Sequence, residues 1–392
     1  MGRAERRVVR GRGGMTMRVA LLTTFHQRCG VATYAESLVS ALQATGECDV
    51  SIFAPHLPPG DEPIGDQPPR LWNRNRAFGF EAVRVVRALT AAGCEVVHAN
   101  VNLSLFSSRF LFTLTQLLRR KRIPLVVTFH GRDGGSLGRR FKVWRLYRAV
   151  RGAEIVVHNE LHARELIAHG HTRVHVVPHG MPPVERRPLE EARAAIGLHP
   201  TRPMLAHFGF LVPDKGVLEV LRAFAQLRAS RLPDLYYWIS GALYNSDESR
   251  SYFAALKAEI ARLGVAEHVH LTGEFVSHDE AMAAMQAASW IVLNYRTGNA
   301  QGASGAISRA FGSGRPVAVS AARVFDDVRE ATHTLEGDDL ADAIAAALES
   351  PELAARTVAR AEDYCARASW PRVAERHVEL YRRAIAGRAE GA

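Results

Sequence analysis

The chain has 392 residues, of which 47% are hydrophobic and 23% are charged, and its net charge is +10 at neutral pH. This composition is typical of a folded globular protein and excludes a largely disordered one. The length exceeds that of a single hydrophobic core, so we expect two domains, and the lack of a long apolar run predicts no transmembrane helix.

The N-terminal segment, MGRAERRVVRGRGGMT, is basic and rich in glycine. It lacks the apolar centre of a signal peptide, so we interpret residues 1–16 as a disordered basic tail. The four cysteines are scattered and have neither metal-ligand nor redox spacing. Reduced thiols in a cytoplasmic protein are the simplest interpretation.

From residue 17 onward, short apolar runs alternate with amphipathic helical segments. In the first half we expect strands at 17–24, 50–54, 95–99, 124–128, 154–158 and 174–177, and helices at 34–45, 81–92, 107–119, 137–150 and 161–169. Residues 61–76 are rich in Pro, Gly and Asp and predict a loop. The alternation of strands and helices predicts a parallel sheet with helices on both faces.

The second half begins after a proline-rich, charged segment with a short central helix, 181–203, which we interpret as a linker. The alternation then restarts, with strands expected at 204–208, 235–240, 269–272, 290–293 and 316–319, and helices at 217–229, 249–263, 279–287, 338–348, 352–368 and from 370 to about 386. The chain therefore predicts two doubly wound α/β halves. In such sheets ligands bind beyond the carboxyl ends of the strands, so we expect a cleft between the halves.

A Gly/Ser-rich turn over 298–305 connects the apolar run 290–293 to a short helix at 306–311. A strand that leads through such a turn into a helix gathers free N–H groups at the positive end of the helix dipole, where phosphate binds well. Ser304 is positioned to cap the helix or to donate a hydroxyl. Taken alone, an ordinary strand-to-helix turn is the commoner explanation.

Basic residues greatly outnumber the single acid, Asp133, between residues 119 and 151. Within this region GRRFKVWRLYRAV (138–150) interleaves aromatic and aliphatic residues with Arg and Lys. At helical spacing this pattern suits an anionic membrane surface, with Trp144 and Tyr147 at the interface. A helix that packs its apolar side on its own domain would have the same pattern. No nucleic-acid-binding motif accompanies the basic residues, so we do not expect nucleic acid as a partner.

Several segments together resemble the retaining GT-B glycosyltransferases, especially family 4, the "group 1" enzymes. The resemblance runs from about residue 17 to the C-terminus. Its segments are CGVATYAESLVSAL (29–42), VTFHG (127–131), VHVVPHGM (174–181), HFGFLVPDKGVLEVLRAFAQL (207–227), VHLTGEFVSHDEAMAAMQAASWIVLNY (269–295) and WPRVAERHVELYRRAI (370–385).

The resemblance implies a GT-B fold, with two Rossmann-like domains facing across a cleft. It implies an acceptor-side domain over 17–180, a nucleotide-sugar domain over 204–369, and a C-terminal helix over 370–392 that crosses back to the first domain. It also implies a retaining, metal-independent glycosyltransferase of the hexosyltransferase type, which needs no cofactor beyond its nucleotide-diphosphate sugar. The acceptor would be a polar lipid, a glycan or a small molecule in bacterial glycan biosynthesis. The enzyme would act in the cytoplasm or peripherally at the inner membrane face.

Residue by residue, the resemblance implies that Lys215 lies beside the donor phosphates and neutralises charge on the leaving diphosphate. It implies a glycine-rich loop around Gly30 and Val31 that closes on the diphosphate, and a catalytic role for His130 near the sugar. The donor phosphates would lie over the turn formed by Gly302, Ala303, Ser304, Gly305 and Ala306. We expect an exposed ammonium at Lys215. Without the resemblance, the commoner explanation for Lys215 is a solvated lysine. For His130 it is a hydrogen-bonded histidine at the end of a strand.

The sequence departs from the family pattern at three positions. Gln301 and Arg309 occupy the places of two glutamates that usually flank the turn, and Phe210 replaces an arginine. Gln301 can still hydrogen-bond sugar hydroxyls, and Arg309 and Arg296 are candidates for binding phosphate. Because of these departures, a catalytically silent GT-B scaffold and a pseudo-glycosyltransferase remain as alternatives.

Overall fold

The contacts of the chain divide it into two compact units, which we describe separately. The first unit runs to Gly180 and resumes at Trp370, and the second unit is Met181–Ser369. The computed structural model describes residues 16–27, 29–58, 64–74, 78–102, 104–130, 132–133, 137–244, 246–296, 300–301 and 305–390. The tail expected at residues 1–16 therefore lies outside the described residues, except for its last position.

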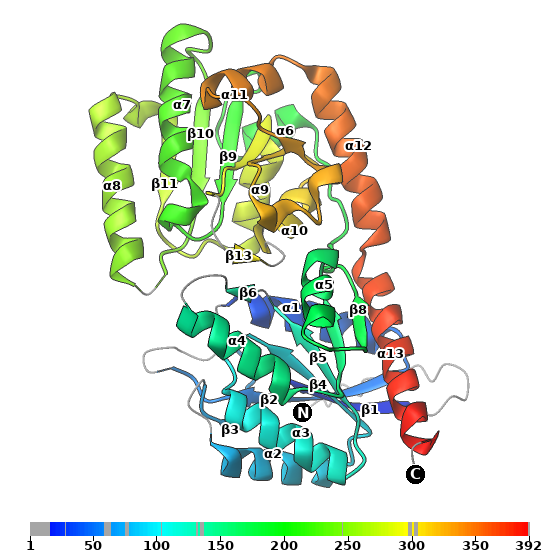
Figure 1. Cartoon of the computed structure of the whole chain (residues 1–392). Helices are drawn as coiled ribbons and strands as arrows, with labels where there is room; N and C mark the ends of the chain where they lie inside the picture. The colour runs from blue at the N-terminus through cyan, green and yellow to red at the C-terminus, as the bar shows by residue number, and fades with distance from the viewer. Residues whose placement is uncertain are drawn as a thin grey trace, which may run out of the picture. The chain divides into compact units, whose positions relative to one another are not determined.

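The first unit contains a seven-stranded sheet in the order β3-β2-β1-β4-β5-β7-β8, and every pairing in it is parallel (Figure 1). Its strands are β1 (Met17–Leu22), β2 (Cys48–Pro55), β3 (Arg70–Trp72), β4 (Val96–Val101), β5 (Leu125–Phe129), β7 (Glu154–Val157) and β8 (Val174–Val176). The strand order reverses between β1 and β4, because β2 follows β1 on one side and β4 lies on the other. Loops that diverge at such a point leave room for a ligand.

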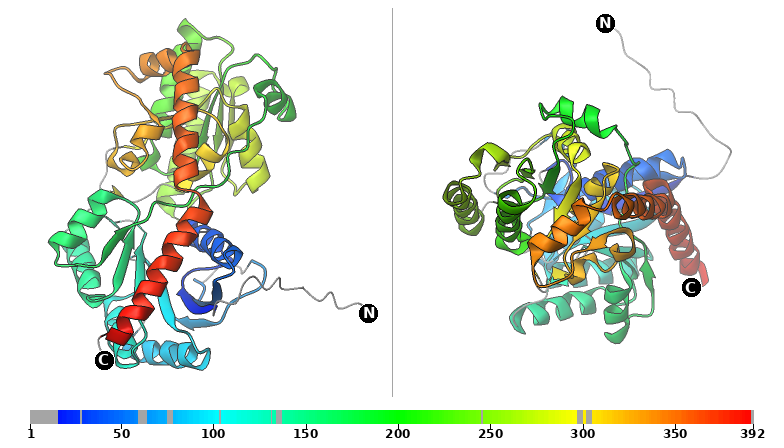
Figure 2. Two further views of the ribbon diagram at one scale, coloured as in Figure 1. Left: turned by 90° about the vertical axis from the view of Figure 1, so that its right-hand side faces the viewer. Right: turned by 90° about the horizontal axis from the view of Figure 1, so that it is seen from above.

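Six helices cover this sheet: α1 (Gly30–Ala44), α2 (Gly79–Ala91), α3 (Ser108–Arg120), α4 (Leu137–Ala149), α5 (Glu160–Ala168) and α13 (Trp370–Glu390). The apolar sides of α2 to α5 form one hydrophobic core with the sheet, and those of α1 and α13 form another. Figure 2 shows α13 (red) alongside α1 (blue), and the two helices are in contact. The C-terminal helix therefore completes the first unit.

A buried polar network fixes α13 to the sheet. His98 of β4 hydrogen-bonds with the Tyr381 hydroxyl at 2.6 Å through Nδ1 and with the Thr128 hydroxyl at 2.7 Å through Nε2. His377 stacks on His98 with ring centroids 5.4 Å apart. Because buried polar groups are costly unless paired, these contacts specify one position for the helix.

The prediction of a loop over 61–76 is wrong for Arg70–Trp72, which forms the edge strand β3. Trp72 is fully buried, stacks on Phe106 and Phe110, and donates its Nε1–H to the Leu105 carbonyl. The prolines and charged residues around Leu71 and Trp72 are not typical of a strand, so the sequence pattern does not indicate one. Only the aromatic side chains of a distant segment explain why it is buried.

The second unit contains a six-stranded sheet, also all parallel, in the order β11-β10-β9-β12-β14-β15. Its strands are β9 (Met204–Phe208), β10 (Tyr236–Ser240), β11 (Val269–Thr272), β12 (Trp290–Leu293), β14 (Val317–Val319) and β15 (His333–Thr334), the last of which was not predicted. Here the strand order reverses between β9 and β12. The loops after these two strands contain Lys215, Arg296 and the Gly/Ser-rich turn.

Helices cover both faces of the second sheet. They are α6 (Leu189–Ala195), α7 (Val217–Ser230), α8 (Asp247–Leu263), α9 (His278–Ala287), α10 (Gly305–Gly312), α11 (Leu340–Leu348) and α12 (Pro351–Arg367). Shorter pieces of the second unit are β13 (Ala300–Gln301), η1 (Pro213–Lys215), η2 (Ala266–His268), η3 (Arg323–Phe325) and η4 (Arg329–Ala331), and the short strand β6 (Arg132–Asp133) belongs to the first unit. Helix α6, in the segment 181–203, packs against α9, and its Ala192 is fully buried. The prediction of two doubly wound α/β halves is confirmed. Within the described residues, no helix is long and apolar enough to cross a membrane.

Candidate active site

The loop after β9 is held tightly against the end of β12. The short helix η1 ends at Lys215, and Gly216 then adopts a positive φ of 63°. A side chain at Gly216 is excluded because its Cβ would lie 1.9 Å from the carbonyl oxygen of Asn294. The Lys215 ammonium lies 3.6 Å from the centroid of the Tyr295 ring. Lys215 is therefore half-buried over an aromatic face, and the prediction of an exposed side chain is wrong.

Arg296 contacts the same loop and the helix that follows it. Its backbone N–H donates to the Asp214 carbonyl at 2.9 Å, and its Nε lies 3.9 Å from a carboxylate oxygen of Glu219. Glu219 is in the first turn of α7. Two cations, Lys215 and Arg296, thus lie at the reversal point of the second sheet.

The start of α10 reaches the same place. Gly302, Ala303 and Ser304 lie outside the described residues, and for Gln301 only its position in β13 is described. Gly305 begins α10, and Ala306 lies close to Gly209, which follows β9. A Cβ at Gly209 would lie 3.9 Å from Ala306 Cβ and 4.0 Å from the Tyr295 hydroxyl. The ends of β9 and β12 and the helix N-terminus therefore converge within van der Waals range.

Arg309 is half-buried one turn further along α10. Its guanidinium carbon lies 5.0 Å from the centroid of the Phe208 ring, at the end of β9. Burial lowers the pKa of this guanidinium from its usual value. Arg309 therefore adds a third cation to the site, held by an aromatic side chain and not by a described acid.

His207 also belongs to this site, although sequence analysis did not select it. It lies inside β9, where its Nδ1–H donates to the Val292 carbonyl at 3.3 Å. Its Nε2 is buried without a partner among the described residues and would be 4.0 Å from a Cβ at Gly209. Burial, reinforced by the charge of Lys215, lowers the pKa of His207 to about 4. The sequence indicated a role for His207 in only one way. It is the single polar residue in an apolar strand that ends at the expected cleft.

In the first unit, His130 follows β5 and is oriented by a chain of hydrogen bonds. His158 must donate its Nδ1–H to the Val177 carbonyl, 3.0 Å away, because a carbonyl only accepts. The Nε2 of His158 is then an acceptor for Nδ1–H of His130, at 3.5 Å. This leaves the Nε2 of His130 with a free lone pair, and that atom is buried without a partner among the described residues.

The surroundings of His130 are neutral and aromatic. The ring of Tyr34 lies edge-on at 4.5 Å between centroids, and Tyr34 also contacts His158, His179 and Trp370. Burial, together with the neighbouring histidines, lowers the pKa of His130 well below its ordinary value, and burial lowers that of His158 to about 3. Both rings are therefore uncharged at neutral pH. The sequence did not indicate that His158 and His179 contribute to this site, because only the fold brings them close to His130.

Gly30 and Val31 lie in the first turn of α1, four residues before the helix start expected from sequence. Cys29 caps this helix, with its Sγ accepting from the Ala32 N–H at 3.4 Å. The N–H groups of Gly30 and Val31 donate to no described residue, and nothing lies within 4 Å of a Cβ built on Gly30. An open helix N-terminus thus follows β1 at the reversal point of the first sheet.

The structure thus places the predicted residues in two separate groups. The second unit brings together Lys215, Arg296, Ala306 and Arg309, and the first unit holds Gly30, Val31 and His130. Among the described side chains, no group of three or more His, Cys, Asp and Glu is arranged to hold a metal ion.

The sequence matches two family models that follow one another along the chain. Residues 28–185 match the model described as Glycosyltransferase Family 4, and residues 189–364 match the model described as Glycosyl transferases group 1. None of the curated proteins matches the chain.

Solved structures resemble almost the whole chain. Sucrose-phosphate synthase from Thermosynechococcus elongatus has a TM-score of 0.73 at 18% identity, over 95% of this chain and 100% of its own. HepE of Anabaena, in complex with UDP and glucose, has a TM-score of 0.68 at 17% identity, over 93% of this chain and 99% of its own. An α,α-trehalose-phosphate synthase from Burkholderia xenovorans has a TM-score of 0.66 at 13% identity, over 93% of this chain and 100% of its own. These likenesses show the GT-B fold, and with the two family models they identify the protein as a GT-B glycosyltransferase.

Proposed function

We propose that the protein is a retaining, metal-independent glycosyltransferase that uses a nucleotide-diphosphate sugar. The observation that carries the proposal is the convergence of Lys215, Arg296 and the start of α10 at the reversal point of the second sheet. Cations and free N–H groups at one such point suit a diphosphate. The bound UDP in the structurally similar HepE supports the same class of donor.

In this proposal Lys215 and Arg296 neutralise the charge that develops on the leaving diphosphate. Tyr295 holds the Lys215 ammonium by a cation–π contact, so little reorganisation is needed when the phosphate arrives. We propose that the turn Gly302–Gly305 donates N–H groups, that Gln301 hydrogen-bonds a sugar hydroxyl, and that Arg309 binds phosphate.

On the first unit we propose that Gly30 and Val31 donate their N–H groups to the diphosphate. His130 would act near the transferred sugar. Its buried lone pair at Nε2 can accept a hydrogen bond from a sugar hydroxyl, and His158 fixes the tautomer that presents it. The neutral, aromatic lining suits an uncharged sugar better than a phosphate.

The acceptor that we propose is a polar lipid, a glycan or a small molecule of bacterial glycan biosynthesis. We propose an enzyme of the cytoplasm that works at the inner membrane face when the acceptor is a lipid. A catalytically silent binding protein is the alternative, and one observation favours it. The site lacks the usual glutamates, and the carboxylate of Glu219 contacts Arg296.

The nucleotide sugar that copurifies with the protein, identified by mass spectrometry, tests the function most economically. Incubation with that donor and candidate acceptors then separates enzyme from scaffold. Transfer that continues in EDTA, with the anomeric configuration of the product unchanged by NMR, supports the full proposal. Tight donor binding without transfer or hydrolysis would favour the silent protein, and activity restored by Mg²⁺ after EDTA would contradict metal independence.

A further inference from the structure

The helix α4 combines the two alternatives that its sequence left open. Val143, Leu146 and Tyr147 are buried, and Tyr147 hydrogen-bonds His162 at 3.0 Å. The expectation that Tyr147 lies at a membrane interface is therefore wrong. Phe141 and Trp144 point outward and are 56% and 39% exposed.

The neighbouring helices extend this exposed aromatic surface. Phe112 of α3 is 54% exposed and Phe80 of α2 is 71% exposed. Helices α2, α3 and α4 pack side by side on one face of the first sheet (Figure 1). Of the eleven large apolar side chains that are exposed among the described residues, six lie at or on these three helices: Phe78, Phe80, Val83, Phe112, Phe141 and Trp144. We call the outer surface of α2, α3 and α4 the aromatic-basic face.

Charge on the aromatic-basic face has a single sign. The only acid in the three helices is Glu81, which is buried and accepts from the N–H groups of Asn73 and Phe78. The exposed basic residues are Arg84, Arg87, Arg109, Arg119, Arg120, Arg140, Lys142, Arg145 and Arg148. On α2, Phe80, Val83, Arg84 and Arg87 fall on one helical stripe. Aromatic and cationic groups are therefore mixed on this face without an exposed acid.

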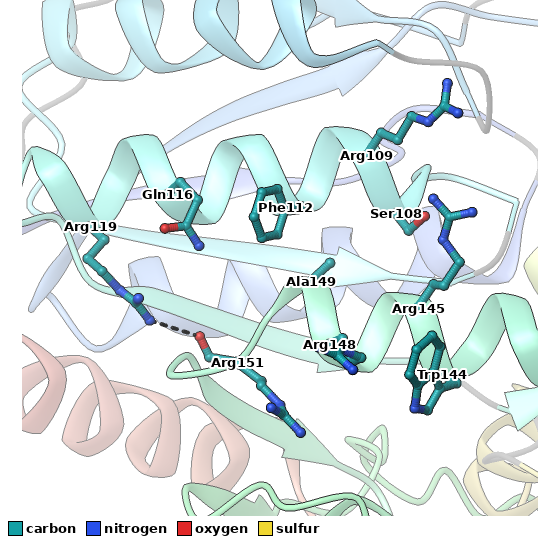
Figure 3. A pocket seen from close by; sticks show the side chains of 10 residues that line it. All are labelled: Ser108, Arg109, Phe112, Gln116, Arg119, Trp144, Arg145, Arg148, Ala149 and Arg151. Carbon is teal, nitrogen blue, oxygen red and sulfur yellow. Dashed lines mark hydrogen bonds between the residues drawn. The ribbon is translucent and has the colours of Figure 1, made fainter.

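A groove of about 470 Å³ runs between α3 and α4 within this face. In Figure 3, Arg109 and Arg145 lie at one end of it, and Arg119 lies at the other, donating to the Arg151 carbonyl at 3.2 Å. The guanidinium of Arg148 lies 4.9 Å from the centroid of the Trp144 ring. None of these five arginines forms an ion pair with a described residue. Unpaired guanidinium groups in a groove are suited to bidentate recognition of phosphate.

We propose that the aromatic-basic face binds the surface of an anionic phospholipid bilayer. Phe80, Phe112 and Trp144 would enter the headgroup region, where amphipathic and aromatic side chains are stabilised. The groove arginines would bind lipid phosphates, and the lack of an exposed acid removes repulsion from the membrane. This face deepens the membrane part of the proposed function. It requires neither a bound donor nor turnover.

Vesicle binding of the full-length protein tests the proposal. The protein should sediment with phosphatidylcholine vesicles that contain phosphatidylglycerol, and not with phosphatidylcholine alone or at high salt. Arg145→Glu/Arg148→Glu should lower the partition coefficient roughly tenfold or more. Arg356→Glu/Arg360→Glu, with the same charge change on exposed positions of α12, should have a much smaller effect. Equal loss in the two double variants would overturn the assigned face.

Insertion of the aromatic side chains has its own measurement. Trp144 is the only exposed tryptophan of the five in the chain, so brominated lipids should quench its fluorescence when the face contacts the bilayer. Quenching should disappear in Trp144→Phe, and vesicle binding should weaken in Phe112→Ala but hardly in Ile167→Ala, an equally exposed position on α5. Two results together would overturn the proposal in favour of a site for soluble polyanions: soluble polyphosphate or nucleic acid abolishes vesicle binding, and brominated lipids do not quench Trp144. Nucleotide binding by the same variants is measured by calorimetry. A protein that binds nucleotide but not vesicles would contradict this proposal and leave the proposed function intact.

Discussion

The two units share an architecture but differ in charge where their strands end. In the second unit the loops after β9 and β12 carry Lys215 and Arg296, and helix α10 carries Arg309. In the first unit His130 and its histidine neighbours are uncharged, because burial lowers their pKa values. One scaffold therefore supports two kinds of site. The cationic one suits a diphosphate and the neutral one suits a sugar.

The difference arises from short segments and not from the sheets. Lys215 is held by Tyr295, which lies 80 residues further along the chain, and His130 is held by His158 through a single hydrogen bond. Either contact can be removed without changing a strand. Substitutions at these positions should therefore affect one site and leave the other intact.

The largest effect is expected at Gly216, which holds the Lys215 loop. Gly216→Ala places a Cβ 1.9 Å from the Asn294 carbonyl oxygen at a positive φ, and we expect a loss of roughly 3 kcal/mol in the free energy of unfolding of the second unit. Gly264→Ala is the matched control, because its φ of 67° is similar but nothing lies within 4 Å. Chemical denaturation that gives the same loss for both variants would show that the contact with Asn294 does not matter.

The neutral site predicts a loss of turnover without a loss of diphosphate binding. His130→Ala should lower kcat roughly 100-fold, since one group positioned at the reacting centre typically contributes that much. Its affinity for nucleoside diphosphate should change less than about twofold, because no charge is removed. His169→Ala, at an exposed histidine of the same unit, should alter neither quantity. A large loss of diphosphate affinity in His130→Ala would break the division of roles between the units.

Acid should destabilise the first unit more than the second. Burial lowers the pKa of His98, His130, His158 and His377 in the first unit, for His377 to about 4. Below about pH 6.5 these histidines bind protons in the unfolded chain but stay unprotonated in the folded unit. The free energy of unfolding therefore falls as the pH decreases toward the folded pKa values. Each such histidine contributes at most about 1.4 kcal/mol per pH unit in that window.

Hydrogen exchange at about pH 7.5 and about pH 5.5 measures this acid dependence for each unit. Of the described histidines in the second unit, His207 alone is fully buried, so that unit should lose less protection. Equal losses in the two units would contradict the contrast in buried histidines.

The smallest effect is expected from Arg296→Ala. The contact of Arg296 with Glu219 is exposed and 3.9 Å long, so its loss should change the free energy of unfolding by less than about 1 kcal/mol. Titration calorimetry should show weaker diphosphate binding by roughly threefold to tenfold, because one partly screened charge is removed. An unchanged affinity would place Arg296 outside the donor site.

The sequence predicted the local elements well because strands and helices of this fold have clear apolar periodicity. The resemblance to the GT-B glycosyltransferases also selected Lys215 in the loop after β9 and Arg309 on α10. It could not predict β3, since the burial of Trp72 depends on Phe106 and Phe110 in another segment.

Other features depend on contacts between residues far apart in the chain. His130, His158 and His179 follow three different strands, β5, β7 and β8, and the sequence gives no spacing that would connect them. The exposure of Phe112 beside Trp144 likewise requires the packing of α3 against α4. Such features become visible only when the fold is known.

The most direct test of the cationic site in the second unit is titration calorimetry of UDP with the wild-type protein and Lys215→Ala. The variant should fold normally, because Lys215 makes no described ion pair, and its contact with Tyr295 is at the edge of the core. We predict at least about a tenfold loss of affinity, equivalent to about 1.4 kcal/mol, for a charge-assisted phosphate contact. Lys257→Ala, which removes a lysine that also lies over an aromatic ring, should bind UDP like the wild type. Equal affinities of the wild type and Lys215→Ala would contradict the assignment of the diphosphate site to the reversal point between β9 and β12.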